Sequence, residues 1–139
     1  MTKLARDVMT ENPVCCTPET PLDEVAKLMR QYDFGEIPVI DPAEQPIGVV
    51  TDRDIVCRVV AEGKNPLAYP ASICMSQPVV TVLTTAPLAE VVAEMEKYQV
   101  RRVPVVDERG RCVGMISQAD VAWMGPKRDV AELLREVSR

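Results

Sequence analysis

The sequence predicts an α+β (α/β) fold made of two equivalent βαββα half-domains, packed about a pseudo-two-fold axis, and a terminal helix. The main observation is an internal repeat: residues 21–55 align with residues 87–121 without a gap, at a constant offset of 66 positions. Of these 35 aligned positions, 11 are identical and eight others exchange one apolar residue for another, which indicates a duplicated unit. We therefore expect half-domains at residues 1–66 and 67–125, a helix at residues 126–139, and a ligand cleft between the halves.

The first half of each repeat is predicted to be a short strand followed by an amphipathic helix. In the first repeat Pro13–Cys16 is the strand, Thr20 is the N-cap and Pro21 opens the helix. The two helices end at the equivalent residues Tyr32 and Tyr98. Each helix carries an apolar stripe at helical spacing, formed by Leu22, Val25, Ala26 and Met29 in one copy and by Leu88, Val91, Val92 and Met95 in the other.

The second half of each repeat is predicted to be a β-hairpin followed by a helix. The strands are short β-branched runs separated by turn residues: Ile37–Ile40 with Ile47–Val50, and Val103–Val106 with Cys112–Ile116. The helices that follow cover Asp52–Glu62 and Gln118–Met124, and short helical leads precede the repeats at Leu4–Met9 and Pro70–Met75. The terminal helix places Val130, Leu133 and Leu134 on one face, which could pack on the domain or on a second chain.

The composition excludes several classes of function. A net charge of −5 and a pI near 4.8 argue against nucleic-acid binding, which normally uses a basic excess. No apolar run is as long as a membrane span, and the N-terminus lacks the apolar stretch of a signal peptide. We therefore expect a cytoplasmic protein of one compact domain, with no membrane partner.

Cysteine and histidine usage narrows the chemistry further. The five cysteines are odd in number and form no Cys-x-x-Cys motif, so a disulfide framework is not expected. Most are expected to be buried thiols, and a redox role for the vicinal pair Cys15 and Cys16 stays open. The sequence has no histidine, which removes the commonest metal ligand and the commonest general base. We expect no catalytic residues, no cofactor, no metal site and no enzyme activity.

Three motifs occur twice and together resemble a known family. The first is Val8-Met9-Thr10, which corresponds to Cys74-Met75-Ser76. The second is a strand with a proline in second position, Ile37–Asp41 and Val103–Asp107. The third is the segment Gly48–Asp54, which corresponds to Gly114–Asp120. The chain resembles a tandem pair of CBS (cystathionine-β-synthase) domains, often called a Bateman module. This resemblance implies a βαββα fold per repeat, sheets packed against each other, and frequent assembly of two chains into a homodimer. It also implies binding of AMP, ADP, ATP or S-adenosylmethionine to regulate an attached or partner protein.

The resemblance also implies roles for individual residues. The carboxylate of Asp54 or Asp120 would accept hydrogen bonds from the ribose hydroxyls, with Thr51 or Ser117 beside the sugar or phosphate. A carboxylate suits a vicinal diol because it offers two acceptor oxygens. From the residues alone, Thr51 and Ser117 are expected to be helix N-caps, and free N–H groups at those helix starts would favour a phosphate.

The proline-containing strands have both a core and a ligand interpretation. Ile37 and Val103 are expected to face the core in part, because alternate strand residues do. In the family, these residues and the following Pro38 and Pro104 line the purine pocket. Both prolines lack an N–H and therefore suit an edge strand beside an opening.

The repeats differ in charge just before these prolines. Arg101 and Arg102 in the second repeat replace Gly35 and Glu36 of the first, and a basic residue at the Arg102 position often meets ligand phosphates in the family. Arginine offers a planar donor fork that fits phosphate oxygens, although both arginines could instead form ordinary surface ion pairs. We therefore expect the second repeat to be the main site. The first repeat could be empty, hold a neutral or cationic adenosyl group, or only brace the second.

The sequence supports a non-catalytic regulatory module that binds an adenosine nucleotide, with AMP or ATP favoured. The alternative is a protein-interaction or oligomerisation module with degenerate ligand sites, in which the Ser/Thr-x-x-Asp segments are only helix caps. The identity of any regulated partner protein cannot be predicted from the sequence.

Overall fold

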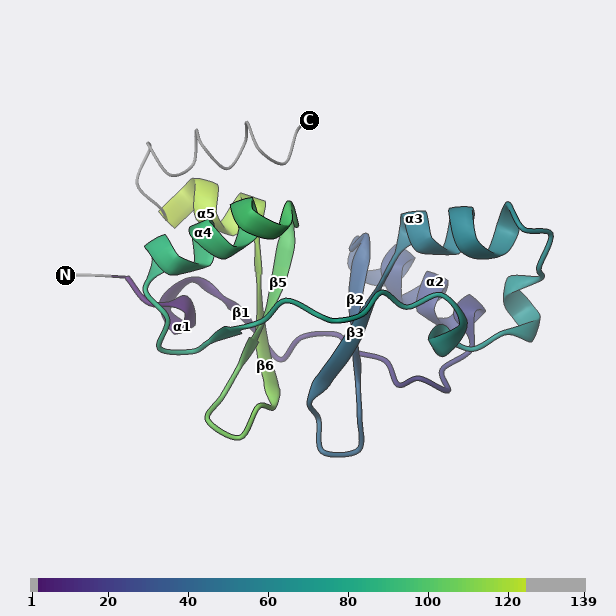
Figure 1. Ribbon diagram of the computed structural model, residues 1–139, viewed down its shortest axis with the longest axis horizontal. Coiled ribbons are helices and arrows are strands. Elements are labelled where there is room, and N and C mark those ends of the chain that lie inside the picture. Colours follow the sequence, from purple (N-terminus) through teal and green to yellow (C-terminus); the bar gives the residue numbers. More distant parts are fainter. Residues whose placement is uncertain (1–2, 125–139) are drawn as a thin grey trace. The chain divides into compact units, whose positions relative to one another are not determined.

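The computed structural model describes residues 3–124 (Figure 1) and confirms the predicted α+β fold class. The α-helices are α1 (Ala5–Val8), α2 (Leu22–Tyr32), α3 (Asp52–Ile55), α4 (Leu88–Tyr98) and α5 (Gln118–Met124). A π-helix, η1 (Val56–Val60), continues α3, and two 3-10 helices are η2 (Pro66–Ala68) and η3 (Ala71–Ile73). The strands are β1 (Thr10–Glu11), β2 (Glu36–Ile40), β3 (Pro46–Thr51), β4 (Val82–Leu83), β5 (Arg102–Val106) and β6 (Cys112–Ser117).

The chain forms two compact units, and each combines one repeat with a lead segment. The first-repeat unit spans residues 14–79, and within the described residues the second-repeat unit combines residues 3–13 with residues 80–124. In the second-repeat unit Thr10 of β1 pairs with Met115 of β6, and in the first-repeat unit Ser76 pairs with Val49 of β3. The division therefore differs from the expected boundary after residue 66. The segment that precedes each repeat adds to the last strand of the other repeat.

Both predicted β-hairpins are confirmed, as antiparallel pairs of β2 with β3 and of β5 with β6 (Figure 1). The aspartate that follows each first strand organises the hairpin loop. Asp41 Oδ1 accepts the N–H groups of Ala43 and Gln45, both at 2.9 Å. Asp107 Oδ1 accepts two equivalent N–H groups, also at 2.9 Å. The repeated aspartate of these strands therefore has a structural function in the loop.

The strand predicted at Pro13–Cys16 is shorter than expected. Only Cys16 pairs with β2, where its N–H donates to Pro38 O at 2.9 Å and its carbonyl accepts from Ile40 N at 2.8 Å. The next bond of this parallel ladder would need an N–H at residue 38, which proline lacks. Pro38 therefore limits the pairing to one residue.

The equivalent strand of the second repeat, β4, is one residue longer for a related reason. Thr84 N–H donates to Val106 O at 3.0 Å, whereas the equivalent residue of the first repeat is Pro18, which has no N–H. Because β4 pairs with β5, β5 lies inside a four-stranded sheet of order β1-β6-β5-β4. The prediction that Pro104 lies on an edge strand is therefore wrong, although β4 pairs with β5 only beyond Pro104.

The helices α2 and α4 are confirmed and end at the predicted tyrosines, with two corrections in α2. The N-cap is Pro21 and not Thr20, because Thr20 Oγ1 accepts the N–H of Thr17 at 2.9 Å in the preceding turn. Ala26 is exposed, so it does not belong to the buried stripe. The buried stripe consists of Leu22, Val25 and Met29 in α2 and of Leu88, Val91, Val92 and Met95 in α4.

Each unit has its own apolar core. The core of the first-repeat unit contains α2, the hairpin strands, Val59 of η1 and the buried cysteines Cys16 and Cys74. The core of the second-repeat unit contains α1, α4, the strands β4, β5 and β6, and Val121 of α5. The predicted helical leads are present as α1 and η3, and the helix expected at residues 126–139 lies outside the described residues. Within residues 3–124, no helix has the length and apolar character needed to cross a bilayer.

A methionine of each lead segment lies over a glycine of the last strand. A Cβ atom on Gly48 would lie 2.9 Å from Ser76 O and 3.2 Å from Met75 Sδ. A Cβ atom on Gly114 would overlap the side chain of Met9. The repeated methionine and the repeated glycine are therefore in contact in both units, and the glycine is needed because the lead segment approaches so closely.

Candidate functional site

The predicted N-caps after β3 and β6 are confirmed as reciprocal capping boxes. In the first-repeat unit Asp54 N–H donates to Thr51 Oγ1 at 3.0 Å, and Thr51 N–H donates to Asp54 Oδ2 at 2.9 Å. In the second-repeat unit Asp120 N–H donates to Ser117 Oγ at 3.2 Å, and Ser117 N–H donates to Asp120 Oδ2 at 2.8 Å. Each box fixes a carboxylate and a hydroxyl close together at the end of a hairpin.

The expectation of free N–H groups at these helix starts is wrong for the first residues. Gln118 N–H donates to Arg101 O at 2.8 Å, and the equivalent Asp52 N–H donates to Gly35 O at 2.9 Å. The third N–H groups, of Asp54 and Asp120, donate within the capping boxes, and the Arg53 N–H donates to Asp52 Oδ1 at 2.8 Å. The first and third N–H groups of both helix starts are therefore engaged within the protein.

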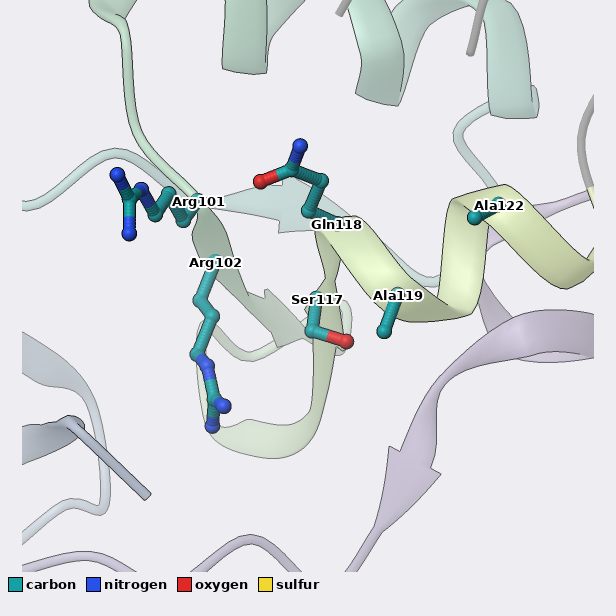
Figure 2. A pocket seen from close by; sticks show the side chains of 6 residues that line it. All are labelled: Arg101, Arg102, Ser117, Gln118, Ala119 and Ala122. Atoms are coloured by element: carbon teal, nitrogen blue, oxygen red, sulfur yellow. The ribbon is translucent and has the colours of Figure 1, made fainter. Parts of the chain in front are cut away.

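A cavity of about 380 Å³ opens at this end of the second-repeat unit (Figure 2). It is lined by Arg101, Arg102, Ser117, Gln118, Ala119 and Ala122. Arg101 precedes β5 and Arg102 begins it, Ser117 ends β6, and the other three residues lie on α5, so the hairpin brings them together. In Figure 2 the two arginine side chains leave the strand in different directions.

The residues that line this cavity favour an anionic ligand. They provide two guanidinium groups, one amide and one hydroxyl, and none of them is acidic. Arginine is well suited to phosphate because its planar fork can donate two parallel hydrogen bonds. Asp120 does not line the cavity, but its carboxylate is held beside Ser117 and is half-buried.

The predicted purine-lining residues are buried. Ile37 and Val103 are fully buried in the cores of their units, and Pro38 and Pro104 are buried as well. The core interpretation of Ile37 and Val103 is therefore confirmed. These four residues support the ends of the hairpins, and none of them lines the cavity of the second-repeat unit.

The sequence analysis missed Gln118, Ala119 and Ala122. Gln118 could have been found by comparing the repeats. It is aligned with Asp52, and Arg102 is aligned with Glu36, so the second repeat lacks both acidic residues of the first. The two alanines gave no comparable signal, since small apolar residues are common on helices.

The equivalent place in the first-repeat unit has the opposite charge and different contacts. Glu36 and Asp52 stand where the second repeat has Arg102 and Gln118. Asp54 is only 9% exposed, and its carboxylate contacts further polar groups of its own unit. The two repeats therefore share the capping box but not its electrostatic surroundings.

The vicinal cysteines do not provide a reactive thiolate at Cys16. Burial, and then the neighbouring Cys74, raise the pKa of the Cys16 thiol to about 12, so it stays protonated at neutral pH. Burial, followed by the charge of Asp54, also raises the pKa of Cys74, and Arg58 acts in the opposite direction. Within residues 3–124, no three Cys, Asp or Glu side chains are grouped in a way that could hold a metal ion.

These repeats and capping boxes define a duplicated βαββα protein with a polar cavity in the second-repeat unit. The sequence matches the model of the CBS domain family over residues 5–61 and 71–123. The chain belongs to the CBS domain family.

Two relatives differ in how much of their length this chain spans. Hypoxic response protein 1 of Mycobacterium tuberculosis is 32% identical over 133 residues, which is 96% of this chain and 92% of that protein. The uncharacterized protein MK0525 of Methanopyrus kandleri is 37% identical over 121 residues, which is 87% of this chain but only 59% of that protein.

Three solved structures of CBS-type proteins are similar. Hypoxic response protein I, determined with two coordinated zinc ions, has a TM-score of 0.82 and 35% identity over 89% of this chain and 100% of that one. The CBS domain pair of MJ0100, in complex with 5′-methylthioadenosine and S-adenosyl-L-methionine, has a TM-score of 0.79 and 25% identity, with 89% and 96% covered. PAE2072 of Pyrobaculum aerophilum, complexed with AMP, has a TM-score of 0.79 and 26% identity, with 96% and 99% covered.

Proposed function

We propose that this protein is a non-catalytic regulatory module that binds an adenosine nucleotide, chiefly at the second repeat. The observation that carries the proposal is the cavity in which Arg101 and Arg102 meet Ser117, beside the carboxylate of Asp120. The AMP bound by PAE2072 and the two adenosyl ligands bound by MJ0100 support this ligand class. AMP is our first choice and ATP the second, because the cavity offers two cations to phosphate groups.

Each residue of the site has a proposed role. Asp120 accepts hydrogen bonds from the ribose hydroxyls, and Ser117 lies beside the sugar. Arg101 and Arg102 bind the phosphate, since charge-assisted hydrogen bonds are the stronger ones. The buried Val103 and Pro104 fix the start of β5, with Pro104 beside the base, as Ile37 and Pro38 do for β2 in the first repeat.

The first repeat is proposed to be the weaker site. Thr51 and Asp54 reproduce the capping box of Ser117 and Asp120, but Glu36 would repel a phosphate. A neutral or cationic adenosyl compound, such as adenosine or S-adenosylmethionine, suits this position better.

Regulation requires that the ligand prefers one conformation of the protein over another. We propose that the module acts as a cytoplasmic homodimer. The conformation that the ligand favours would then regulate an unidentified partner protein. Val56 and Val60 of η1 are 57% and 53% exposed and lie on one face of the helix, so they are candidates for contact with a second copy.

A thermal-shift screen of nucleotide-free protein tests the proposed function. AMP, ADP, ATP, S-adenosylmethionine and GTP would be compared at millimolar concentration. At about 100 times Kd a ligand adds about 2.7 kcal/mol to the free energy of unfolding, which raises the melting temperature by several degrees. We expect AMP or ATP to give the largest shift. If no adenosine compound shifts the transition, the interaction module replaces this proposal.

Replacing Arg102 with alanine should weaken binding of AMP and ATP much more than binding of adenosine. A hydrogen bond to a charged group contributes about 1.5–3 kcal/mol, so the loss for AMP should be roughly tenfold to a hundredfold. Isothermal titration calorimetry of the variant with AMP and adenosine measures the difference. Arg53→Ala is the matched control, because Arg53 is an exposed arginine on α3 of the other unit. An equal loss for AMP and adenosine would show that Arg102 does not bind phosphate.

A further inference from the structure

Asp54 and Asp120 occupy equivalent positions, but their carboxylates have different neighbours. Besides the Thr51 N–H, Asp54 Oδ2 lies 3.5 Å from Ser76 Oγ, and Asp54 Oδ1 lies 3.7 Å from Arg58 Nε. Asp120 Oδ2 accepts the N–H of its own capping box, and no other hydrogen bond or ion pair of this carboxylate is formed with the side chains of residues 3–122. Both oxygens of Asp54 are therefore engaged, whereas among the described side chains only Oδ2 of Asp120 has a partner.

The two groups that engage Asp54 also hold the lead segment Cys74–Ser76. Arg58 Nη1 donates to Cys74 O at 3.3 Å, and Ser76 N–H donates to Val49 O of β3 at 2.8 Å. Cys74 itself is 1% exposed, so this segment is packed into the unit and is not a free loop. Arg58 and Ser76 thus connect the carboxylate of the first repeat to the segment that leads toward the second repeat.

The second repeat cannot form the same arrangement from its sequence. Met124 stands at the position equivalent to Arg58, and its thioether carries no charge. Thr10 stands at the position equivalent to Ser76, and it makes no contact with Asp120 in the described part of the chain. The engagement of Asp54 is therefore a specific difference between the repeats.

We propose that Arg58 and Ser76 form a latch on Asp54, which makes the first repeat the weaker adenosine site and couples its occupancy to the segment Cys74–Ser76. This inference rests on the proposed function. A ribose diol needs carboxylate oxygens that can accept its hydrogen bonds, so a ligand at Asp54 must displace Ser76, Arg58 or both. The Arg58 side chain is 55% exposed, which makes its ion pair weak, and the Ser76 contact is long. Together they should weaken the first site roughly tenfold.

The binding test uses Asp120→Ala protein, in which the second repeat is silenced, and adenosine, which carries no phosphate for Glu36 to repel. Adding Arg58→Met, the residue of the second repeat, should tighten adenosine binding roughly threefold by calorimetry, because the Ser76 contact remains. Arg53→Met is the matched control, since it removes the same charge from α3, which η1 continues, and the Arg53 side chain forms no ion pair with Asp54; it should change nothing. Adding Asp54→Ala should abolish the gain. Unchanged or weaker binding in the Arg58→Met protein would overturn the latch, as would an equal gain with Arg53→Met.

A second measurement needs no ligand. Amide hydrogen exchange at Ser76 in otherwise wild-type protein should become several-fold faster with Arg58→Met and stay unchanged with Arg53→Met, because the latch holds this segment on β3. Equal exchange in the two variants would overturn the latch even if nucleotides bind. If the wild-type protein binds no adenosine compound, the proposed function fails, and exchange at Ser76 alone decides whether the latch exists.

Discussion

Replacing Asp120 with alanine is expected to weaken AMP binding by roughly two orders of magnitude. In the proposed complex the carboxylate accepts two hydrogen bonds from the ribose, and each such bond to a charged group contributes about 1.5 kcal/mol or more. The protein already fixes this carboxylate, because Asp120 Oδ2 accepts the Ser117 N–H at 2.8 Å. None of the residues that line the cavity is acidic, so Asp120, beside Ser117, is the proposed acidic acceptor for the sugar.

The matched control is Asp54→Ala, the same substitution at the equivalent position. Both variants lose a capping box, which costs about 1 kcal/mol of stability, so a difference in binding cannot come from the cap. We expect Asp54→Ala to keep AMP affinity within about threefold of wild type. Calorimetry with AMP, together with a melting curve for each variant, separates folding from binding. An equal loss of affinity in both variants would refute the asymmetry between the repeats.

Replacing Gly48 with alanine is expected to reduce the free energy of unfolding by about 3 kcal/mol. The new Cβ would lie 2.9 Å from Ser76 O, a backbone atom that accepts the Val49 N–H at 3.1 Å. The backbone cannot move away without breaking the pairing of the lead segment with β3. Urea denaturation measures the effect.

The equivalent substitution Gly114→Ala should cost less, about 1–2 kcal/mol, because the nearest atoms belong to the Met9 side chain, which can change rotamer. A double-mutant cycle distinguishes the two sites. Met9→Ala should offset part of the cost of Gly114→Ala, whereas Met75→Ala should not offset the cost of Gly48→Ala. Equal costs at the two glycines, or rescue by Met75→Ala, would contradict the backbone contact.

Much of the fold could be predicted because the chain contains two copies of one pattern. The hairpins, the helices α2 and α4 and both capping boxes follow from local spacing and from turn residues that recur in register. The errors are also local. Residue type predicts Thr20 as an N-cap, but its hydroxyl oxygen accepts the Thr17 N–H in the preceding turn. Propensity could not decide between these two partners.

The pairing of each lead segment with the other repeat could not be predicted. The contact of Met9 with Gly114 joins residues at opposite ends of the chain, and nothing in local periodicity indicates it. The repetition of the methionine and of the glycine indicates that both residues are important, but it does not indicate that they are in contact. The effect of Pro38 on the first strand depends on the parallel direction of its pairing, which local sequence does not indicate.

The candidate site was predictable where the two repeats differ. Arg101 and Arg102 were found by comparison with Gly35 and Glu36, and the same comparison contained Gln118 opposite Asp52. The pair of Asp54 and Arg58 could also have been noticed, because an acid four residues before a base is a favourable helical pair. The contact with Ser76 could not, since it depends on tertiary pairing.

A crystal structure of the protein grown with AMP tests the central claim most directly. The account predicts AMP at the second repeat, with its ribose hydroxyls within hydrogen-bond distance of Asp120 and its phosphate on Arg102. The first repeat should be less occupied, with Arg58 still beside Asp54. AMP bound at Asp54 with the second repeat empty, or AMP whose phosphate avoids both arginines, would contradict the account.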